Sequence, residues 1–274
     1  MKKPLCWGAL ALSFTLGMHA QPPAPTYIPQ THFSTGQDVQ PVFEGWLRNT
    51  DGTFTMVFGY FNRNFEEELA IPAGPDNKLE PGAPDRGQPT YFLPRRQQFI
   101  FRVQVPADWG QKELIWSVTA HGKTEKAFAQ LLPVEEISER MIMTHGGLNP
   151  GEDDPNKPPS ITIMQPGPAT VATSLTLTAM VTDDGLPKPR PAPKPRPGAQ
   201  SNTVSNRPRG LNVSWLEYKG PAKVTFEPAG IILVADGKAI TTARFPEPGT
   251  YVLRATANDG ALSTVTDITI TVTR

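Results

Sequence analysis

The chain has 274 residues, with 26 Lys and Arg, 26 Asp and Glu, 31 Pro, 23 Gly and a single Cys. Pro removes a helix hydrogen bond and Gly raises the entropic cost of ordering, so this composition excludes a mainly helical bundle. Balanced charge argues against a nucleic-acid-binding protein. One Cys excludes an intramolecular disulfide framework and a multi-Cys zinc site. The length suits one large domain or two small ones.

Residues 1–20 have the pattern of a secretory signal peptide: a basic start, an apolar stretch over 5–16, then small residues. That stretch is shorter than the ~20 apolar residues that span a bilayer. We predict cleavage after Ala20, with cleavage after Gly17 or an uncleaved anchor as alternatives. The mature chain then lacks Cys6, has no transmembrane segment and is secreted or periplasmic.

Residues 39–143 are predicted to form an antiparallel β-sandwich, after an unstructured segment over 21–38. Short runs alternate apolar and polar residues between Gly, Pro, Asn and Asp, which is typical of strands with one buried face. The expected strands are 42–48, 53–61, 67–71, 98–105, 113–120 and 123–131. Residues 133–140 offer one helical turn.

Residues 144–159 hold four Pro and three Gly without apolar periodicity, which predicts a linker between two domains. From residue 160 to 274 the alternation resumes in seven or eight short strands, as expected of an Ig-like β-sandwich. The fold class is therefore all-β, with two Ig-like antiparallel β-sandwich domains joined by a Pro/Gly-rich linker.

The segment over 243–260, A-R-F-P-E-P-G-T-Y-V-L-R-A-T-A-N-D-G, resembles the end of a PKD-type Ig-like domain. In that family a P-G-x-Y segment leads into the penultimate strand, and a D-G hairpin leads into the last one. The run Val213-Ser214-Trp215 is similar to its central strand with a buried aromatic residue. The resemblance covers 158–273, implies the fold, and implies little about function. The first domain resembles no named family.

A long loop over 182–210 interrupts the second domain, and its centre at 187–197 has Pro at every second position. Loops this long are uncommon in compact domains and are often functional or disordered. The alternating Pro residues favour an extended polyproline II arm. The basic residues of that centre are the predicted partner-binding residues: Lys188, Arg190, Lys194 and Arg196. The alternative is a solvated insertion without a specific role.

No catalytic residue is predicted. The three His of the mature chain form no metal-binding motif, and nucleophile-elbow, phosphate-loop and dinucleotide motifs are missing from the sequence. The runs of three Glu at 66–68 and two Glu at 135–136 are typical of solvated faces. Sugar binding would require an exposed aromatic platform, and Trp109, at an expected turn, is the best candidate for one.

The sequence predicts no cofactor, but calcium is a weak candidate. Asp183-Asp184 and Asn258-Asp259 end strands that could converge at one end of the second sandwich. Calcium takes six to eight oxygen ligands. The alternative is turn chemistry, since Asp and Asn accept hydrogen bonds from their own backbone.

These patterns together favour a secreted, non-enzymatic binding or spacer protein of the cell envelope. Its expected partner is an envelope protein or polysaccharide, and not a nucleic acid. Two alternatives stay open: a carbohydrate-binding accessory module, and a hydrolase with its site at the domain interface.

Overall fold

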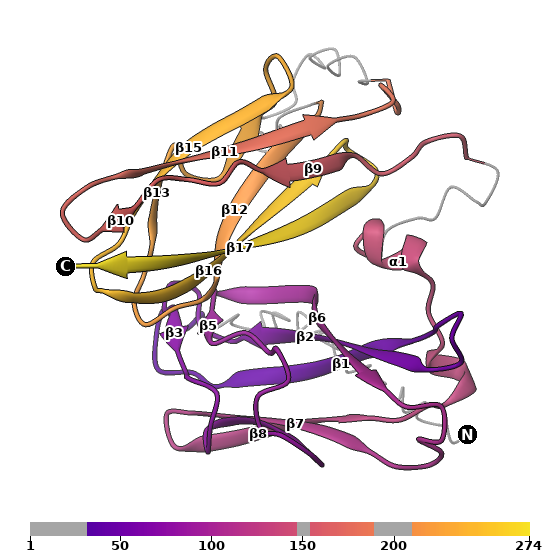
Figure 1. The fold of residues 1–274 in the computed structure, drawn as a ribbon. Helices are drawn as coiled ribbons and strands as arrows, with labels where there is room; N and C mark the ends of the chain where they lie inside the picture. Colours follow the sequence, from indigo (N-terminus) through magenta and orange to yellow (C-terminus); the bar gives the residue numbers. More distant parts are fainter. Residues whose placement is uncertain (1–31, 147–153, 189–209) are drawn as a thin grey trace, which may run out of the picture. The chain divides into compact units, whose positions relative to one another are not determined.

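The computed structural model describes residues 32–146, 154–188 and 210–274. The predicted signal peptide and most of the Pro-rich loop lie outside the described residues. The regular elements of this described part are almost all β-strands, as the alternating patterns predict (Figure 1), and they pair antiparallel except for β10 with β17. No helix in this described part is long and apolar enough to cross a membrane.

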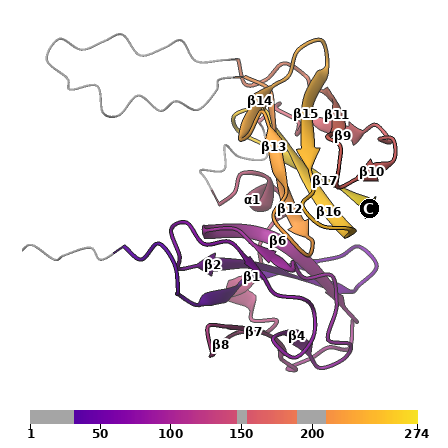
Figure 2. The same ribbon diagram turned by 90° about the vertical axis from the view of Figure 1, so that its left-hand side faces the viewer.

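The first sandwich consists of two three-stranded sheets, labelled in Figure 2, and a short two-stranded ribbon, labelled in Figure 1. One sheet has the order β1-β2-β6, the other has the order β4-β7-β8, and the ribbon pairs β3 with β5. The strands are β1 (Val39–Arg48), β2 (Phe54–Asn62), β3 (Leu69–Ala70), β4 (Asn77–Glu80), β5 (Tyr91–Phe92), β6 (Arg95–Val105), β7 (Leu114–Ala120) and β8 (Lys123–Ala129). If β1, β2, β4, β6, β7 and β8 are lettered A, B, C, E, F and G, the sheets are ABE and CFG, which is the Ig order.

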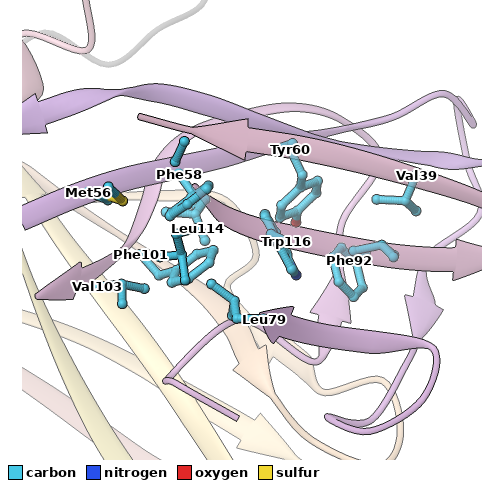
Figure 3. Close-up of a cluster of buried hydrophobic side chains, with 14 of the residues drawn as sticks. Val39, Met56, Phe58, Tyr60, Leu79, Phe92, Phe101, Val103, Leu114 and Trp116 are labelled. Atoms are coloured by element: carbon cyan, nitrogen blue, oxygen red, sulfur yellow. The ribbon is translucent and has the colours of Figure 1, made fainter. Parts of the chain in front are cut away.

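Alternating apolar residues of the two sheets meet in an aromatic core (Figure 3). Trp116 of β7 has no exposed surface and packs edge-on against Phe101 of β6 at 4.7 Å between ring centroids. Phe101 in turn stacks on Phe58 of β2 at 5.1 Å. Such pairs add to the hydrophobic gain of burial, so this cluster holds the two sheets together.

The strand β4 was not predicted from the sequence because its first residue, Asn77, is polar but buried. Asn77 has no exposed surface, and its amide nitrogen donates to the carbonyls of Ile71 and Pro89 at 3.0 and 2.8 Å. Its Oδ1 accepts from Nε1 of Trp116 at 2.9 Å. The side chain therefore supplies hydrogen bonds that apolar residues could not, which removes the alternation that predicts strands.

Residues 32–38, expected to lack structure, lie against the segment after β2. The amides of Phe65 and Glu66 donate to the carbonyls of Phe33 and Ser34 at 3.0 Å each. Asn64 is fully buried and joins the two segments through both amide atoms, which bond to the backbone of Gln37. Residues 32–38 are therefore structured, and the rest of the segment expected to lack structure, residues 21–31, lies outside the described residues.

The expected helical turn over 133–140 is two short pieces, a 3₁₀ turn (Pro133–Glu135) and the helix α1 (Glu139–Met143). Ser138 caps α1, since its side chain accepts from the amide of Met141. Ile142 packs with Leu47 and Val57 in a small separate cluster. This contact packs the last residues before the predicted linker against the first sandwich.

The second sandwich has a four-stranded and a five-stranded sheet, with the orders β13-β15-β11-β9 and β10-β17-β16-β12-β14. Its strands are β9 (Ser160–Ile163), β10 (Ala169–Thr170), β11 (Leu175–Thr182), β12 (Asn212–Lys219), β13 (Thr225–Glu227), β14 (Ile231–Leu233), β15 (Lys238–Arg244), β16 (Gly249–Asn258) and β17 (Ser263–Thr273). In Ig lettering the sheets contain DEBA and GFC, which confirms the Ig-like fold. The strand β14 lies at the edge beside β12, but it follows β13 in the chain, whereas the C′ strand of a variable domain precedes D. The PKD type stays a prediction.

Two side chains mark the Ig character of this second sandwich. Trp215 of β12, the strand equivalent to C, is buried in the core. Tyr251, near the start of β16, donates its hydroxyl to the carbonyl of Glu247 at 2.9 Å. This is the geometry of the tyrosine corner, in which the hydroxyl fixes the turn before strand F.

Replacing Tyr251 with Phe is expected to destabilise the protein by about 1 kcal/mol, the net contribution of one such hydrogen bond. The ring stays in place against Phe245, with 4.8 Å between centroids, so core packing is preserved. Urea unfolding measures the change. A variant as stable as the wild type would show that the corner contributes nothing.

The two sandwiches share direct contacts within the unit that spans 32–274. The amide of Thr90 donates to the carbonyl of Tyr218 at 3.1 Å, and the hydroxyl of Tyr218 donates to the carbonyl of Gly87. Tyr218 of β12 belongs to the core cluster of the first sandwich, with Leu216 and Val252 packed against it. The outward face of β12 and β16 is therefore an interface and not a solvated surface.

Candidate functional site

The base of the long loop holds most of the residues that the sequence analysis singled out in the second sandwich. The loop leaves β11 after Thr182 and returns to β12 at Asn212. These strands belong to different sheets, so the loop is the Ig B–C connection. In variable domains the B–C loop is one of the binding loops at one end of the sandwich.

Side-chain hydrogen bonds hold the described residues at the loop base. Asp184 accepts from the amides of Lys157 and Leu186 at 3.0 and 2.9 Å, one on each carboxylate oxygen. Asp183 accepts from the amide of Gly185 at 3.0 Å. On the returning side, the amide nitrogen of Asn212 donates to the carbonyl of Gly210 at 2.8 Å. The first and last described residues of the loop therefore have fixed positions.

The turn between β16 and β17 lies at the same base. Asp259 is 5% exposed, and its Oδ1 accepts from the amides of Ala261 and Leu262 at 2.6 and 2.7 Å. Its Oδ2 accepts from the amide nitrogen of Asn156 at 3.1 Å. Asn258 accepts from the amide of Gly260 at 2.8 Å. The end of the linker, the start of the loop and this turn are thus hydrogen-bonded to one another or to their own backbone.

The structure places the calcium candidates Asp183, Asp184, Asn258 and Asp259 in turns, as the alternative interpretation expects. Among the residues that the structure describes, no three His, Cys, Asp or Glu side chains gather in a way that could hold a metal ion. Of the predicted partner-binding residues, Lys188 is the last described residue before the gap, and it is exposed. Arg190, Lys194 and Arg196 lie outside the described residues.

The expectation that Trp109 forms an exposed platform is wrong. Its side chain is 6% exposed, belongs to the first core cluster and donates from Nε1 to the carbonyl of Lys112 at 2.7 Å. The turn around it is on the surface, but the indole folds back under the turn and covers the core. The carbohydrate-binding alternative thereby loses the aromatic residue on which it depended.

Two of the three Glu residues over 66–68, Glu67 and Glu68, have side-chain partners in the described structure. Glu67 contacts Nε2 of His121 at 3.1 Å. Glu68 accepts from the hydroxyl of Tyr91 at 2.7 Å and from Nζ of Lys223, in the second sandwich, at 2.6 Å. Glu68 therefore belongs to the contact between the sandwiches.

Glu217 of β12 is a buried carboxylic acid that the sequence analysis did not single out. It is 3% exposed, and its Oε2 accepts from the amide of Val224 at 2.8 Å. Its Oε1 has no hydrogen-bond partner in the described structure. Burial raises the pKa of Glu217 to about 7, and the charge of Glu68 acts in the same direction. The signal was available, since Val213, Trp215 and Glu217 alternate along one strand.

A shallow groove of about 450 Å³ lies in the first sandwich, along residues 69–76 and 119–121. Its lining is mainly the Pro72-Ala73-Gly74-Pro75 turn and the end of β7. His121 stands at this groove, paired with Glu67 as described above. None of the predicted site residues lines it.

No family model and no curated protein matches this chain. Among solved structures, the D00–D0 domain of intimin is 12% identical over 86% of this chain and all of its own, with a TM-score of 0.29. A chimeric titin Z1Z2 is 11% identical over 87% of this chain and all of its own, with a TM-score of 0.26. A conjugative transposon lipoprotein from Bacteroides eggerthii is 10% identical over 41% of this chain and 96% of its own, with a TM-score of 0.27.

Similarities this distant carry no conclusion about function. The Ig-like fold rests instead on the strand order of both sandwiches and on the tyrosine corner at Tyr251. No family is therefore assigned to the chain.

Proposed function

We propose that the protein is a secreted, non-enzymatic binding or spacer protein of the cell envelope, which presents the basic loop over 182–210 to an acidic envelope partner. The single observation that carries the proposal is the loop base: a long B–C connection between two sheets, with both ends fixed by side-chain hydrogen bonds. A fixed base gives a long loop a defined origin, and function in such folds concentrates on loops carried by a rigid scaffold.

The contact between the sandwiches supports the spacer part of the proposal. Because Tyr218 and Arg254 of the second sandwich bond to the backbone of the first, the loop base is coupled to both domains. Two domains bonded in this way hold the loop at a more constant distance from the rest of the protein than two domains on a free linker would. The location proposed for the protein, outside the cytoplasmic membrane, rests on the predicted signal peptide.

The test is a pull-down from envelope extract with the full mature chain and with two variants. In one variant residues 187–197 are deleted, and in the other a Gly/Ser segment of the same eleven residues replaces them. Both variants are expected to lose the partners that the wild type recovers, because the charges and the stiff backbone are gone. Because the replacement keeps the loop length, comparing the two variants distinguishes an effect of the loop's composition from an effect of its length.

Two outcomes would contradict the proposal. If both variants recover the same partners as the wild type, the loop does not bind them. If only the deletion loses them, reach matters and the basic Pro-rich sequence does not.

A further inference from the structure

The residues over 218–224, which lead from the end of β12 towards β13, contact the first sandwich. The amide of Gly220 donates to Oγ1 of Thr90 at 3.3 Å. Nζ of Lys223 donates to Oε1 of Glu68 at 2.6 Å. We call residues 218–224 the junction segment, because the second sandwich reaches the first through them.

The carboxyl group of Glu217 packs against the same segment from inside the second sandwich. Its Oε2 accepts from the amide of Val224 at 2.8 Å, and its Oε1 has no hydrogen-bond partner in the described structure. A Cβ on Gly220 would overlap Oε1 of Glu217 and the ring of Tyr251, so glycine lets the backbone lie directly on both groups. The junction segment thus contacts the first sandwich and a buried carboxyl at once.

The titratable groups around Glu217 do not balance a charge on it. Glu68 and Lys223 face it, but Lys223 is bonded to Glu68. The other two neighbours are the hydroxyl groups of Tyr91 on β5 and Tyr251 on β16. Burial raises the pKa of Glu217, and the charge of Glu68 acts in the same direction. An ionised Glu217 would be a buried charge with one hydrogen bond beside a second carboxylate, which is costly.

We propose that Glu217 is a pH-sensitive switch in the junction between the two sandwiches. When Glu217 is protonated, the junction segment stays closed on the first sandwich. When Glu217 is ionised, water enters beneath the segment to solvate the charge, and the contacts of Gly220 and Lys223 break while both sandwiches stay folded. This inference goes beyond the proposed binding function, because it concerns the coupling of the sandwiches whatever the loop binds.

The direction of the switch follows from the proton. The closed junction holds the proton of Glu217 up to a pKa of about 7, whereas an open junction exposes the carboxyl and returns its pKa towards 4.5. The stabilisation of the closed form is therefore complete below pH 4.5 and is lost as pH rises to about 7. Over this interval the equilibrium constant for closing falls by up to about 300-fold, and this carboxyl adds no change at higher pH.

The test is amide hydrogen exchange of the full mature chain, followed by NMR between pH 4.5 and 8. Each rate is divided into the intrinsic rate of that amide at the same pH, which gives a protection factor. The amides of Thr90 and Gly220 report the junction, since they donate to Tyr218 and Thr90 across it. Their protection is expected to fall by up to about 300-fold up to pH 7 and then to level off. Trp116, in the core of the first sandwich, is expected to stay more protected at every pH.

In the E217Q variant the protection of Thr90 and Gly220 is expected to be independent of pH, because the amide has no proton to lose. E247Q is the matched control, since Glu247 is exposed in the same sandwich, and it is expected to behave like the wild type. Protection at Thr90 and Gly220 that ignores pH in the wild type, or that declines equally in E217Q, would overturn the proposal. Protection there equal to that of Trp116 would overturn it as well, because these amides would then exchange only when the whole protein unfolds.

Discussion

Replacing Arg254 with Ala is expected to destabilise the protein by about 3 kcal/mol, because the change removes a nearly buried guanidinium that makes charged hydrogen bonds and an aromatic contact. Its carboxylate partner Asp267 is 37% exposed, so the ion pair itself adds little. Arg254 of β16 is 9% exposed and holds Asp267 of β17 through two bonds of 2.7 and 2.8 Å. Its guanidinium also lies 4.1 Å from the centroid of the Tyr218 ring and donates to the carbonyl of Ile100 in β6. One side chain thus joins two strands of the second sandwich to the first.

Urea unfolding followed by Trp fluorescence measures this effect. R254K keeps the charge but cannot reproduce the planar fork of the guanidinium, so it is expected to recover only part of the loss. R244A is the control, because Arg244 is an exposed residue of β15, and its effect is expected to stay within about 0.5 kcal/mol. An R254A variant as stable as R244A would mean that the sandwiches do not depend on this contact.

Replacing Glu217 with Gln is expected to remove a pH dependence of stability. The pKa of Glu217 is raised from 4.5 to about 7, so between these values the folded state holds a proton that the unfolded state has lost. The free energy of unfolding of the wild type therefore falls as pH rises through this window, by at most about 3 kcal/mol, and this carboxyl adds no further change above it.

E217Q cannot lose a proton, and its amide oxygen can still accept from the amide of Val224. The variant is expected to be more stable than the wild type at pH 8 and similar to it at pH 4.5. Urea titrations at several pH values between 4.5 and 8 measure the difference. E247Q is the control, because Glu247 is exposed. If E217Q shows the same decline with pH as the wild type, the proton is held elsewhere.

Much of the fold could be predicted because alternation reports burial. The strands around Met56, Phe101 and Trp116 place large apolar residues on one face, and each of these faces lies in the core. The P-G-x-Y segment leads into β16, the penultimate strand, as the resemblance implies, whereas the hydrogen bond of the Tyr251 hydroxyl was not predicted. Short strands such as β5 and β10, of two residues each, are too brief to show any period.

The contact between the sandwiches could not be predicted from the sequence. Tyr218 and Arg254 occupy outward positions of their strands, and a sequence pattern does not distinguish a face that meets water from one that meets another domain. The prediction that Trp109 is exposed was wrong for the opposite reason, because a residue at a surface turn can still point its side chain into the core. Asp259 was singled out by its residue type, but only the fold shows that Asn156, at the end of the linker, donates to it.

The most direct test of the proposed function is co-sedimentation of the full mature protein with purified cell envelopes. The comparison is a variant in which Lys188, Arg190, Lys194 and Arg196 are all Gln, measured at low salt and at about 0.3 M salt. The bound fraction of the wild type at low salt is predicted to exceed that of the variant several-fold and to fall towards it at high salt. Equal binding of the two proteins at low salt would contradict the account.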